Sequence, residues 1–308
     1  QLNQRQVKVL EMNMQTKQSD SIKSINRIIN RITAELNIQK KTSQSRISIQ
    51  NTQKSTELSD PVCYQCKYKP QRGACRYEDI GFVPERQSDG NADILVECDL
   101  HKKQQIKRLW EKSGIIKNDF TFKNFKEITP DAKSMKAIAL DYVINFDKIK
   151  NTKHNSLALL GQPGCGKTHL CMAIANHLVN KKAIEVTYLP FREVIPVLKQ
   201  CNNAMNAEIY QRKINKYKTT PVLFIDDLFK KGKNIENSAT DADVKIMFEI
   251  INYRYFNMLP IVVSSELFFD ELNAIDNGTE GRIYQMCKEH RIEVERSIEN
   301  DYRHRDED

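Results

Sequence analysis

The sequence predicts an α/β fold in which a parallel sheet lies between two layers of helices. Short apolar runs alternate with longer helical patterns along residues 113–308, and this alternation is typical of a parallel sheet. Segment 161–168 is a glycine-rich turn with the pattern G-x-x-x-x-G-K-[ST], placed between an apolar run and a helical run. A second apolar run ends in the pair Asp226 and Asp227. These three observations predict a three-layer αβα domain over residues 113–308.

Residues 1–58 are predicted to be a polar extension, because glutamine, asparagine, serine, threonine and lysine dominate them. From about residue 20 to 38, isoleucine and leucine recur at alternating three- and four-residue steps, which predicts a helix with a narrow apolar stripe. The stripe is too thin to form a core alone, so we expect it to pack on a second helix or on a partner protein. Residues 40–60 show no periodicity and are predicted to be a flexible linker.

Residues 59–112 are predicted to form a small zinc-binding module. Cys63 and Cys66 make a C-x-x-C pair, and Cys75, Cys98 and His101 follow it. Structural zinc takes four cysteine or histidine ligands, so the pair and Cys98 leave the fourth ligand open between Cys75 and His101. We favour Cys75, whose thiolate would complete a four-cysteine site, with His101 as the alternative. Free structural thiols are the other interpretation of the same residues.

The elements of the C-terminal domain follow from apolar runs of strand length and from longer helical patterns. Residues 102–112 look helical and lead to a stop at Ser113 and Gly114. Strands are expected at 156–160, 184–189, 222–225 and 261–264, and helices at 135–146, 169–179, 191–199 and 240–255.

The turn from residue 161 to 168 predicts a phosphate-binding loop at the N-terminus of a helix. Its glycines let backbone N–H groups point toward phosphate oxygens. Lys167 would supply charge to the β- and γ-phosphates, and the Thr168 hydroxyl would hold Mg²⁺. The expected nucleotide-binding residues are Gly161, Gln162, Pro163, Gly164, Cys165, Gly166, Lys167, Thr168 and His169.

Two later strands end in polar residues, and ligands of open α/β sheets bind at the carboxyl ends of strands. We expect Asp226 to complete the Mg²⁺ shell and Asp227 to orient or deprotonate the attacking water. At the end of the run 261–264, Ser265 is the candidate for a residue that responds to the γ-phosphate, with Ser264 as the second choice. The predicted cofactors are therefore ATP and Mg²⁺, with Zn²⁺ in the cysteine module.

The composition limits the classes of protein to which the chain can belong. The chain has no apolar stretch of about 18 residues, so we expect no membrane span. Its N-terminal residues are polar, and its eight cysteines are scattered, which together favour a cytoplasmic protein with reduced thiols. The formal net charge of +8 favours a polyanionic partner, although a solvated lysine-rich surface explains the charge equally well.

Two basic clusters suggest where nucleic acid could bind. Basic residues combined with aromatic residues suit single-stranded DNA, because phosphates and bases can then both be contacted. The alternative is that both clusters are ordinary solvated loops. The first cluster comprises Lys213, Lys216 and Lys218 with Tyr210 and Tyr217, and the second comprises Lys230, Lys231 and Lys233.

The chain resembles the DnaC/DnaI family of bacterial and phage helicase loaders, which are AAA+ ATPases related to the initiator DnaA. The resemblance covers roughly residues 61–305. It rests on the cysteine module, the phosphate-binding loop and the Asp-Asp strand together with five short motifs. These motifs are Ser113-Gly-Ile115, Phe122-Lys-Asn-Phe125, Asn252-Tyr-Arg-Tyr255, Ser264-Ser-Glu266 and Gly281-Arg-Ile-Tyr284.

The resemblance implies an ATPase that assembles side by side with copies of itself. Arg282 would be the arginine finger that reaches a neighbour's γ-phosphate, and Arg303 would be a second sensor acting within its own subunit. The N-terminal module would grip the replicative hexameric, DnaB-like helicase, and ATP would control contact with single-stranded DNA. Asp227 stands where a glutamate is commoner, which implies slow hydrolysis.

Three other functions account for parts of the sequence. An IstB-like transposition helper ATPase shares the core, but such proteins typically lack the cysteine module. A DnaA-like initiator would need a duplex-binding helix-turn-helix after the core, which the sequence does not show. A zinc adaptor without catalysis would leave the intact Lys167 and Asp226 without a role.

Overall fold

The computed structural model of this chain describes residues 82–85, 94–97, 99–116, 119–202, 204–230 and 239–304. The predicted extension 1–58 and the cysteines of the predicted zinc site (Cys63, Cys66, Cys75 and Cys98) lie outside these ranges. Within the predicted cysteine module, β1 (Phe82–Glu85) pairs with β2 (Ile94–Glu97) in antiparallel register, with Phe82 opposite Glu97. No pattern noted in the sequence predicts this hairpin.

A five-stranded parallel sheet forms the centre of the C-terminal domain, in the order β4-β5-β6-β3-β7. The parallel sheet and four of its strands confirm the prediction, with shifts of one or two residues at the ends. The fifth strand was missed, because its sequence Arg-Ile-Glu-Val is half polar, as suits the edge of a sheet. The strands are β3 (Leu157–Gly161), β4 (Val186–Pro190), β5 (Val222–Asp226), β6 (Ile261–Ser265) and β7 (Arg291–Val294).

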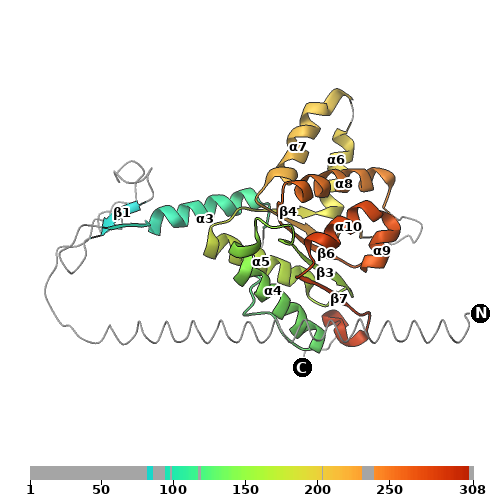
Figure 1. Cartoon of the computed structure of the whole chain (residues 1–308), viewed down its shortest axis with the longest axis horizontal. Helices are drawn as coiled ribbons and strands as arrows, with labels where there is room; N and C mark the ends of the chain where they lie inside the picture. Colours follow the sequence, from blue (N-terminus) through green and yellow to red (C-terminus); the bar gives the residue numbers. More distant parts are fainter. Residues whose placement is uncertain are drawn as a thin grey trace, which may run out of the picture.

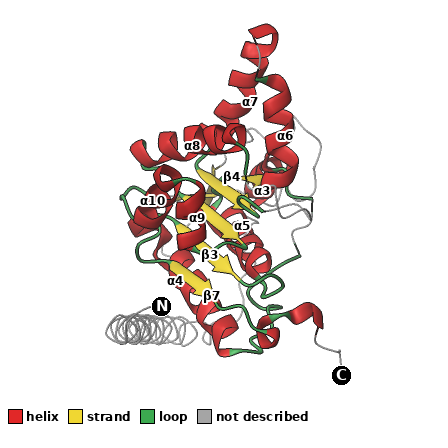
Figure 2. Ribbon diagram, turned by 90° about the vertical axis from the view of Figure 1, so that its right-hand side faces the viewer, coloured by secondary structure: helices red, strands yellow, loops and turns green. Residues whose placement is uncertain are grey.

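Helices cover both faces of the sheet, so the domain has three layers (Figures 1 and 2). On one face lie α4 (Pro130–Ile149) and α5 (Lys167–Lys182), with the end of α3 (Asp99–Ser113) packed against α5 and β4. The other face carries α6 (Phe191–Cys201), α7 (Ala207–Thr219), α8 (Asp241–Phe256), α9 (Phe269–Ile275) and α10 (Asn277–Met286). Short 3-10 turns lie at Ala204–Asn206, Ile298–Asn300 and Tyr302–His304.

The domain has two apolar cores, one on each face of the sheet. Both arise because successive side chains of a fully buried strand point to opposite faces. In β3, Leu157 and Leu159 pack with α4 and α5, whereas Ala158 and Leu160 pack with α6–α10. Each of the strands β3, β5 and β6 has five residues, and all of them are buried. Their apolar sequences therefore reflect helices on both faces rather than one solvent-exposed face.

Helix α8 begins at a capping box, and Thr240 and Asp243 have the [ST]-x-x-[DE] spacing of that motif in the sequence. Thr240 Oγ1 accepts a hydrogen bond from the Asp243 backbone N–H, and the Asp243 carboxylate accepts one from the Thr240 N–H. Lys199 Nζ lies 3.0 Å from the same carboxylate. Partial burial alone would raise the pKa of Asp243, but the hydrogen bonds from Thr240 and Lys199 outweigh it and lower the pKa.

The last turn of α3 joins the N-terminal part of the chain to the sheet domain. Trp110 Nε1 donates a hydrogen bond of 2.9 Å to Asn180 Oδ1 on α5. The helix ends at Ser113, whose side chain is fully buried, and Gly114 follows with a φ of 77°, in the left-handed region that glycine tolerates. No helix of the described residues is long and apolar enough to cross a membrane.

Candidate nucleotide-binding and hydrolysis site

The glycine-rich turn lies at the carboxyl end of β3 and leads directly into α5. Gly164 and Gly166 have φ values of 77° and 91°, which other residues rarely adopt. A Cβ atom on Gly166 would also lie 2.7 Å from the ring of Phe125. These two positions therefore need glycine, and the turn keeps its backbone N–H groups at the N-terminus of α5, where an anion is stabilised.

Lys167 is a buried cation whose hydrogen-bond partners among the described residues are neutral. Its Nζ donates to the carbonyls of Gly161 and Gln162 at 2.8 and 2.6 Å, and lies 3.9 Å from the sulfur of Cys165. Burial lowers the pKa of Lys167, while Cys165 and the nearby carboxylates of Glu266 and Asp227 oppose that effect. A buried ammonium held by carbonyls is a fitting partner for phosphate oxygens.

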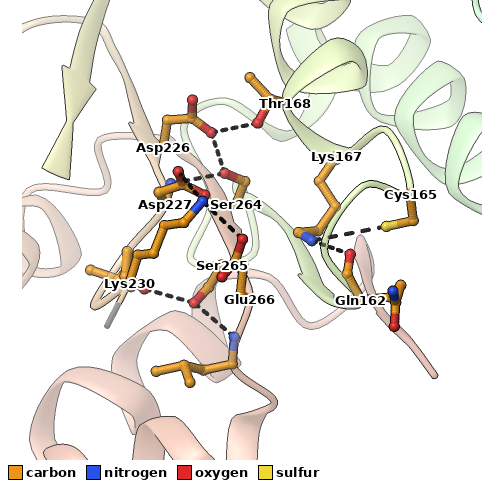
Figure 3. A network of polar contacts seen from close by, with 12 residues as sticks. Gln162, Cys165, Lys167, Thr168, Asp226, Asp227, Lys230, Ser264, Ser265 and Glu266 are labelled. Carbon is orange, nitrogen blue, oxygen red and sulfur yellow. Dashed lines mark hydrogen bonds and ion pairs between the residues drawn. The ribbon is translucent and has the colours of Figure 1, made fainter. Parts of the chain in front are cut away.

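At the end of β5, Asp226 accepts hydrogen bonds from hydroxyl groups of three other elements, and Figure 3 shows those of Thr168 and Ser264. Its Oδ1 accepts a hydrogen bond of 2.9 Å from Thr168 Oγ1 on α5 and another from Ser264 Oγ on β6. Its Oδ2 accepts one of 3.0 Å from Tyr188 on β4. Burial, followed by the charge of Asp226 and this hydrogen bond, raises the pKa of Tyr188. A carboxylate next to a threonine hydroxyl is the hard-oxygen set that Mg²⁺ prefers, so these residues fit the predicted ion.

Asp227 has an unusual backbone for a residue with a side chain, with a φ of 57°. The left-handed region costs about 1–2 kcal/mol for ordinary residues, and aspartate tolerates it better than most. The Asp227 N–H donates to Ser264 Oγ at 3.1 Å, and its Oδ2 lies 2.9 Å from Lys230 Nζ. Lys230 Nζ also lies 2.8 Å from Glu266 Oε1, so one ammonium joins two carboxylates (Figure 3).

The structure favours Ser264 over Ser265 as the serine next to the site. The Ser265 hydroxyl donates to the carbonyl of Leu228 at 2.7 Å and accepts from the Leu267 N–H at 3.1 Å, so it fixes the turn after β6. Ser264 contacts both aspartates instead. Adjacent residues of a strand point to opposite faces, and this alternation separates the two serines.

His169 on α5 faces the segment that precedes α4. Its Nε2 lies 3.0 Å from the Thr121 carbonyl and 3.1 Å from Asn124 Oδ1, and its ring packs edge-on against Phe120 and Phe125. The Phe122–Phe125 motif is thereby held beside the glycine-rich turn.

The two predicted arginines lie in different places. Arg282 on α10 is partly exposed, donates to Asn252 Oδ1 and to the Gly278 carbonyl at 2.7 Å each, and lies 4.6 Å from the centre of the Phe248 ring. Its hydrogen bonds in the structure do not join it to Lys167, Asp226 or the other residues of Figure 3. Arg303 is exposed, but the preceding N–H, that of Tyr302, donates to the Gly164 carbonyl at 3.2 Å, so its turn rests on the phosphate loop.

The basic clusters differ from the prediction in one respect. Tyr210 is buried and donates to Glu249 at 2.9 Å, so the interpretation that it is available for base stacking is wrong. Tyr217 packs partly against the core, and Lys218 pairs with the same Glu249. Lys213 and Lys216 remain exposed on α7. Lys231 and Lys233 lie outside the described residues.

Sequence reasoning missed three side chains of the site: Tyr188, Lys230 and Glu266. Glu266 stands just beyond the carboxyl end of β6, which is the signal that could have revealed it, whereas Tyr188 lies in the middle of β4 and carries no such signal. Lys230 was assigned to a basic cluster instead, because a turn that folds back three residues leaves no periodic pattern.

Comparisons with known proteins agree with this geometry. The family of IstB-like ATP binding proteins matches residues 131–278. Among curated proteins of Bacillus subtilis (strain 168), the chain is 37% identical over 239 residues to the phage-like element PBSX protein XkdC, covering 76% of this chain and 84% of XkdC. It is 38% identical over 212 residues to the uncharacterized protein YqaM, covering 68% of this chain and 66% of YqaM.

A third relative carries a functional name. The chain is 27% identical over 215 residues to the replicative helicase loader DnaI of the same organism, covering 67% of this chain and 66% of DnaI. The extensive match to XkdC, the IstB-like region and the phosphate loop opposite a Mg²⁺-type carboxylate point to one assignment. The chain belongs to the IstB/DnaC-like family of AAA+ ATPases.

Proposed function

We propose that this protein is an ATP-dependent helicase loader, which binds a replicative hexameric helicase and delivers it to single-stranded DNA. The observation that carries the proposal is the combination of an intact nucleotide site with similarity to the loader DnaI over 215 residues. That similarity extends beyond the 148-residue span of the IstB-like match and is therefore not limited to the shared ATP-binding region.

The proposed hydrolysis mechanism follows from the contacts of each side chain. Lys167 would exchange its two carbonyl partners for oxygens of the β- and γ-phosphates. Thr168 and Asp226 would hold Mg²⁺, which neutralises charge on the phosphates. Asp227 would orient the attacking water or accept its proton, and the hydroxyl of Ser264, which contacts both aspartates, is a better candidate than that of Ser265 for reporting on the γ-phosphate.

We propose that the active form is an assembly of several copies. Arg282 would act as an arginine finger toward a neighbour's nucleotide, for which its partly exposed position on α10 is suitable. Its bonds to Asn252 and Gly278 would hold the guanidinium ready in the free subunit. Arg303, on the turn that rests on Gly164, would contact the nucleotide of its own subunit.

The remaining parts of the chain would serve the partners. The N-terminal residues 1–112, with zinc held by Cys63, Cys66, Cys98 and either Cys75 or His101, would bind the helicase. Single-stranded DNA would contact the exposed lysines of α7, chiefly Lys213 and Lys216. With Tyr210 buried, this contact would rest on phosphate attraction more than on base stacking.

A transposition helper is the second candidate, because the family that matches residues 131–278 is named for IstB. The two functions predict different partners for the same ATPase. A helicase loader requires a stable complex with a hexameric helicase, whereas a transposition helper does not.

Co-purification tests the proposal directly. The tagged full chain would be mixed with the purified replicative helicase of Bacillus subtilis, with ATP and without nucleotide, and resolved by size-exclusion chromatography. We expect a complex whose amount depends on ATP, and Lys167→Ala should remove that dependence without removing the N-terminal contact. Failure to form a complex in either condition would favour the transposition function.

A further inference from the structure

Lys230 is bound on both sides by carboxylates at the hydrolysis site. Its Nζ lies 2.9 Å from Asp227 Oδ2 and 2.8 Å from Glu266 Oε1. The three side chains are partly buried, with exposed fractions of 21% for Lys230, 32% for Asp227 and 25% for Glu266. Partial burial strengthens such pairs relative to fully exposed ones, because less water competes for the charges.

The backbone brings Lys230 back toward Asp227. The Lys230 N–H donates to the Asp227 carbonyl at 3.0 Å, which closes a tight turn directly after β5. The positive φ of Asp227 starts this turn, and the Asp227 N–H is held by Ser264. The Asp227–Lys230 pair is therefore built into the loop rather than made by two side chains that meet at a surface.

The pairing leaves one oxygen of Asp227 available. Lys230 binds Oδ2, and Oδ1 has no hydrogen-bond partner among the described residues. An aspartate side chain is one methylene shorter than a glutamate side chain. The position of its carboxylate therefore depends closely on the backbone and on a fixed side-chain rotamer. A cation that anchors one oxygen fixes the direction of the other.

We propose that Lys230 and Glu266 are positioning residues for ATP hydrolysis, with Glu266 holding Lys230 and Lys230 aiming the free oxygen of Asp227 at the attacking water. This role rests on the water-activating function proposed above for Asp227, and it holds whether or not the protein loads a helicase. With this role, Lys230 belongs to the hydrolysis site and not to the second basic cluster, to which its sequence context assigned it. A lysine bound to two carboxylates has little charge left for DNA phosphates.

The test compares steady-state ATP hydrolysis by the full chain with hydrolysis by Lys230→Ala, Lys230→Arg, Glu266→Gln and Asp227→Asn. We expect Lys230→Ala to lower kcat by about 10- to 100-fold with little change in KM, because misplacing a catalytic group lowers the rate rather than nucleotide binding. Lys230→Arg keeps a cation that can reach both carboxylates and should restore much of kcat. Glu266→Gln should lower kcat by less than Lys230→Ala does.

A matched control and a double variant separate this role from a structural one. Lys245→Ala removes an exposed lysine of α8 that is not one of the side chains in contact with Asp227, Lys230 or Glu266, and should leave kcat unchanged. Lys230→Ala combined with Asp227→Asn should be no slower than Asp227→Asn alone, because both changes disable the same carboxylate. Fluorescent-nucleotide affinity measured on each variant reports whether the site still folds.

The measured rates distinguish the role of Lys230 from that of Asp227. An unchanged or raised kcat for Lys230→Ala, with Asp227→Asn strongly slowed, would overturn the positioning role while leaving Asp227 as the water-activating residue. Full activity of Asp227→Asn would refute the role of Asp227 and the positioning role with it. Additive losses in the double variant would mean that Lys230 acts elsewhere, and would overturn the proposal as well.

Discussion

Replacing Arg254 with methionine should destabilise the domain strongly, although the residue lies outside the proposed site. Arg254 on α8 is fully buried, and its hydrogen-bond partners among the described residues include no carboxylate. Its guanidinium instead binds the chain leading into β5 and the residue before β6. The acceptors are the carbonyls of Tyr217, Lys218, Thr220, Pro221 and Pro260.

The size of the effect follows from which of these bonds are buried. Those to Thr220 and Pro260, at 2.8 and 2.6 Å, are buried, and each carbonyl left without a partner costs about 1–3 kcal/mol. Burial also lowers the pKa of Arg254 to about 9, which shows that the charge itself is held at a cost. Removing that cost offsets part of the loss, so we expect Arg254→Met to lower the free energy of unfolding by about 2–4 kcal/mol.

Urea unfolding without nucleotide, followed by circular dichroism, measures this change. Arg254→Lys is the matched control: it keeps the charge but reaches fewer carbonyls, and it should fall between wild type and Arg254→Met. If Arg254→Met unfolded within about 0.5 kcal/mol of wild type, as a surface change does, the five bonds would not hold these segments together and the reasoning would be refuted.

Four further changes test the site, the predicted module and the fold. Lys167→Ala should abolish ATP binding in a fluorescent-nucleotide titration, and normal affinity would mean that the phosphate loop is misassigned. Cys63→Ser with Cys66→Ser should remove about one zinc per chain by metal analysis, and an unchanged zinc content would contradict the predicted module. Arg282→Ala should leave nucleotide affinity intact but lower turnover at concentrations where copies assemble; full turnover would place the finger elsewhere. The pKa of Asp243 is lower in the folded domain than its ordinary value, so its capping contribution is present above the ordinary pKa and is lost as pH falls through the folded value. Asp243→Asn should therefore destabilise the domain at pH 7 and much less near pH 2. Urea titrations at both pH values measure this difference.

Much of the fold could be read from local patterns. The phosphate loop, the apolar runs of β3, β4, β5 and β6 and the helical patterns between them predicted a parallel three-layer domain, because buried strands must be apolar and P-loops need glycine at fixed positions. The edge strand β7 and helices α7, α9 and α10 were not predicted. Their sequences are mixed, and packing on the rest of the domain decides their conformation.

The site was predictable in its parts but not in its arrangement. Motif spacing predicts a site at Lys167, Thr168, Asp226 and Asp227, and the structure brings Thr168 Oγ1 within 2.9 Å of Asp226 Oδ1 across 58 positions of sequence. Spacing favoured Ser265 over Ser264, whereas Ser264 is the one that contacts both aspartates, because the outcome depends on the face of the sheet on which each serine lies. It also misjudged Tyr210, whose burial is set by its packing beside α8.

The sequence by itself predicted a site for a nucleotide phosphate at the turn between β3 and α5 and determined that carboxylates stand at the end of β5. Such information is local, because glycine, lysine and an apolar strand act through the backbone around them. Only the tertiary structure decided that Lys230 turns back to join Asp227 with Glu266 and that Arg254 ties the approaches to two strands. These contacts join residues whose separation in sequence follows no period, so no pattern along the chain records them.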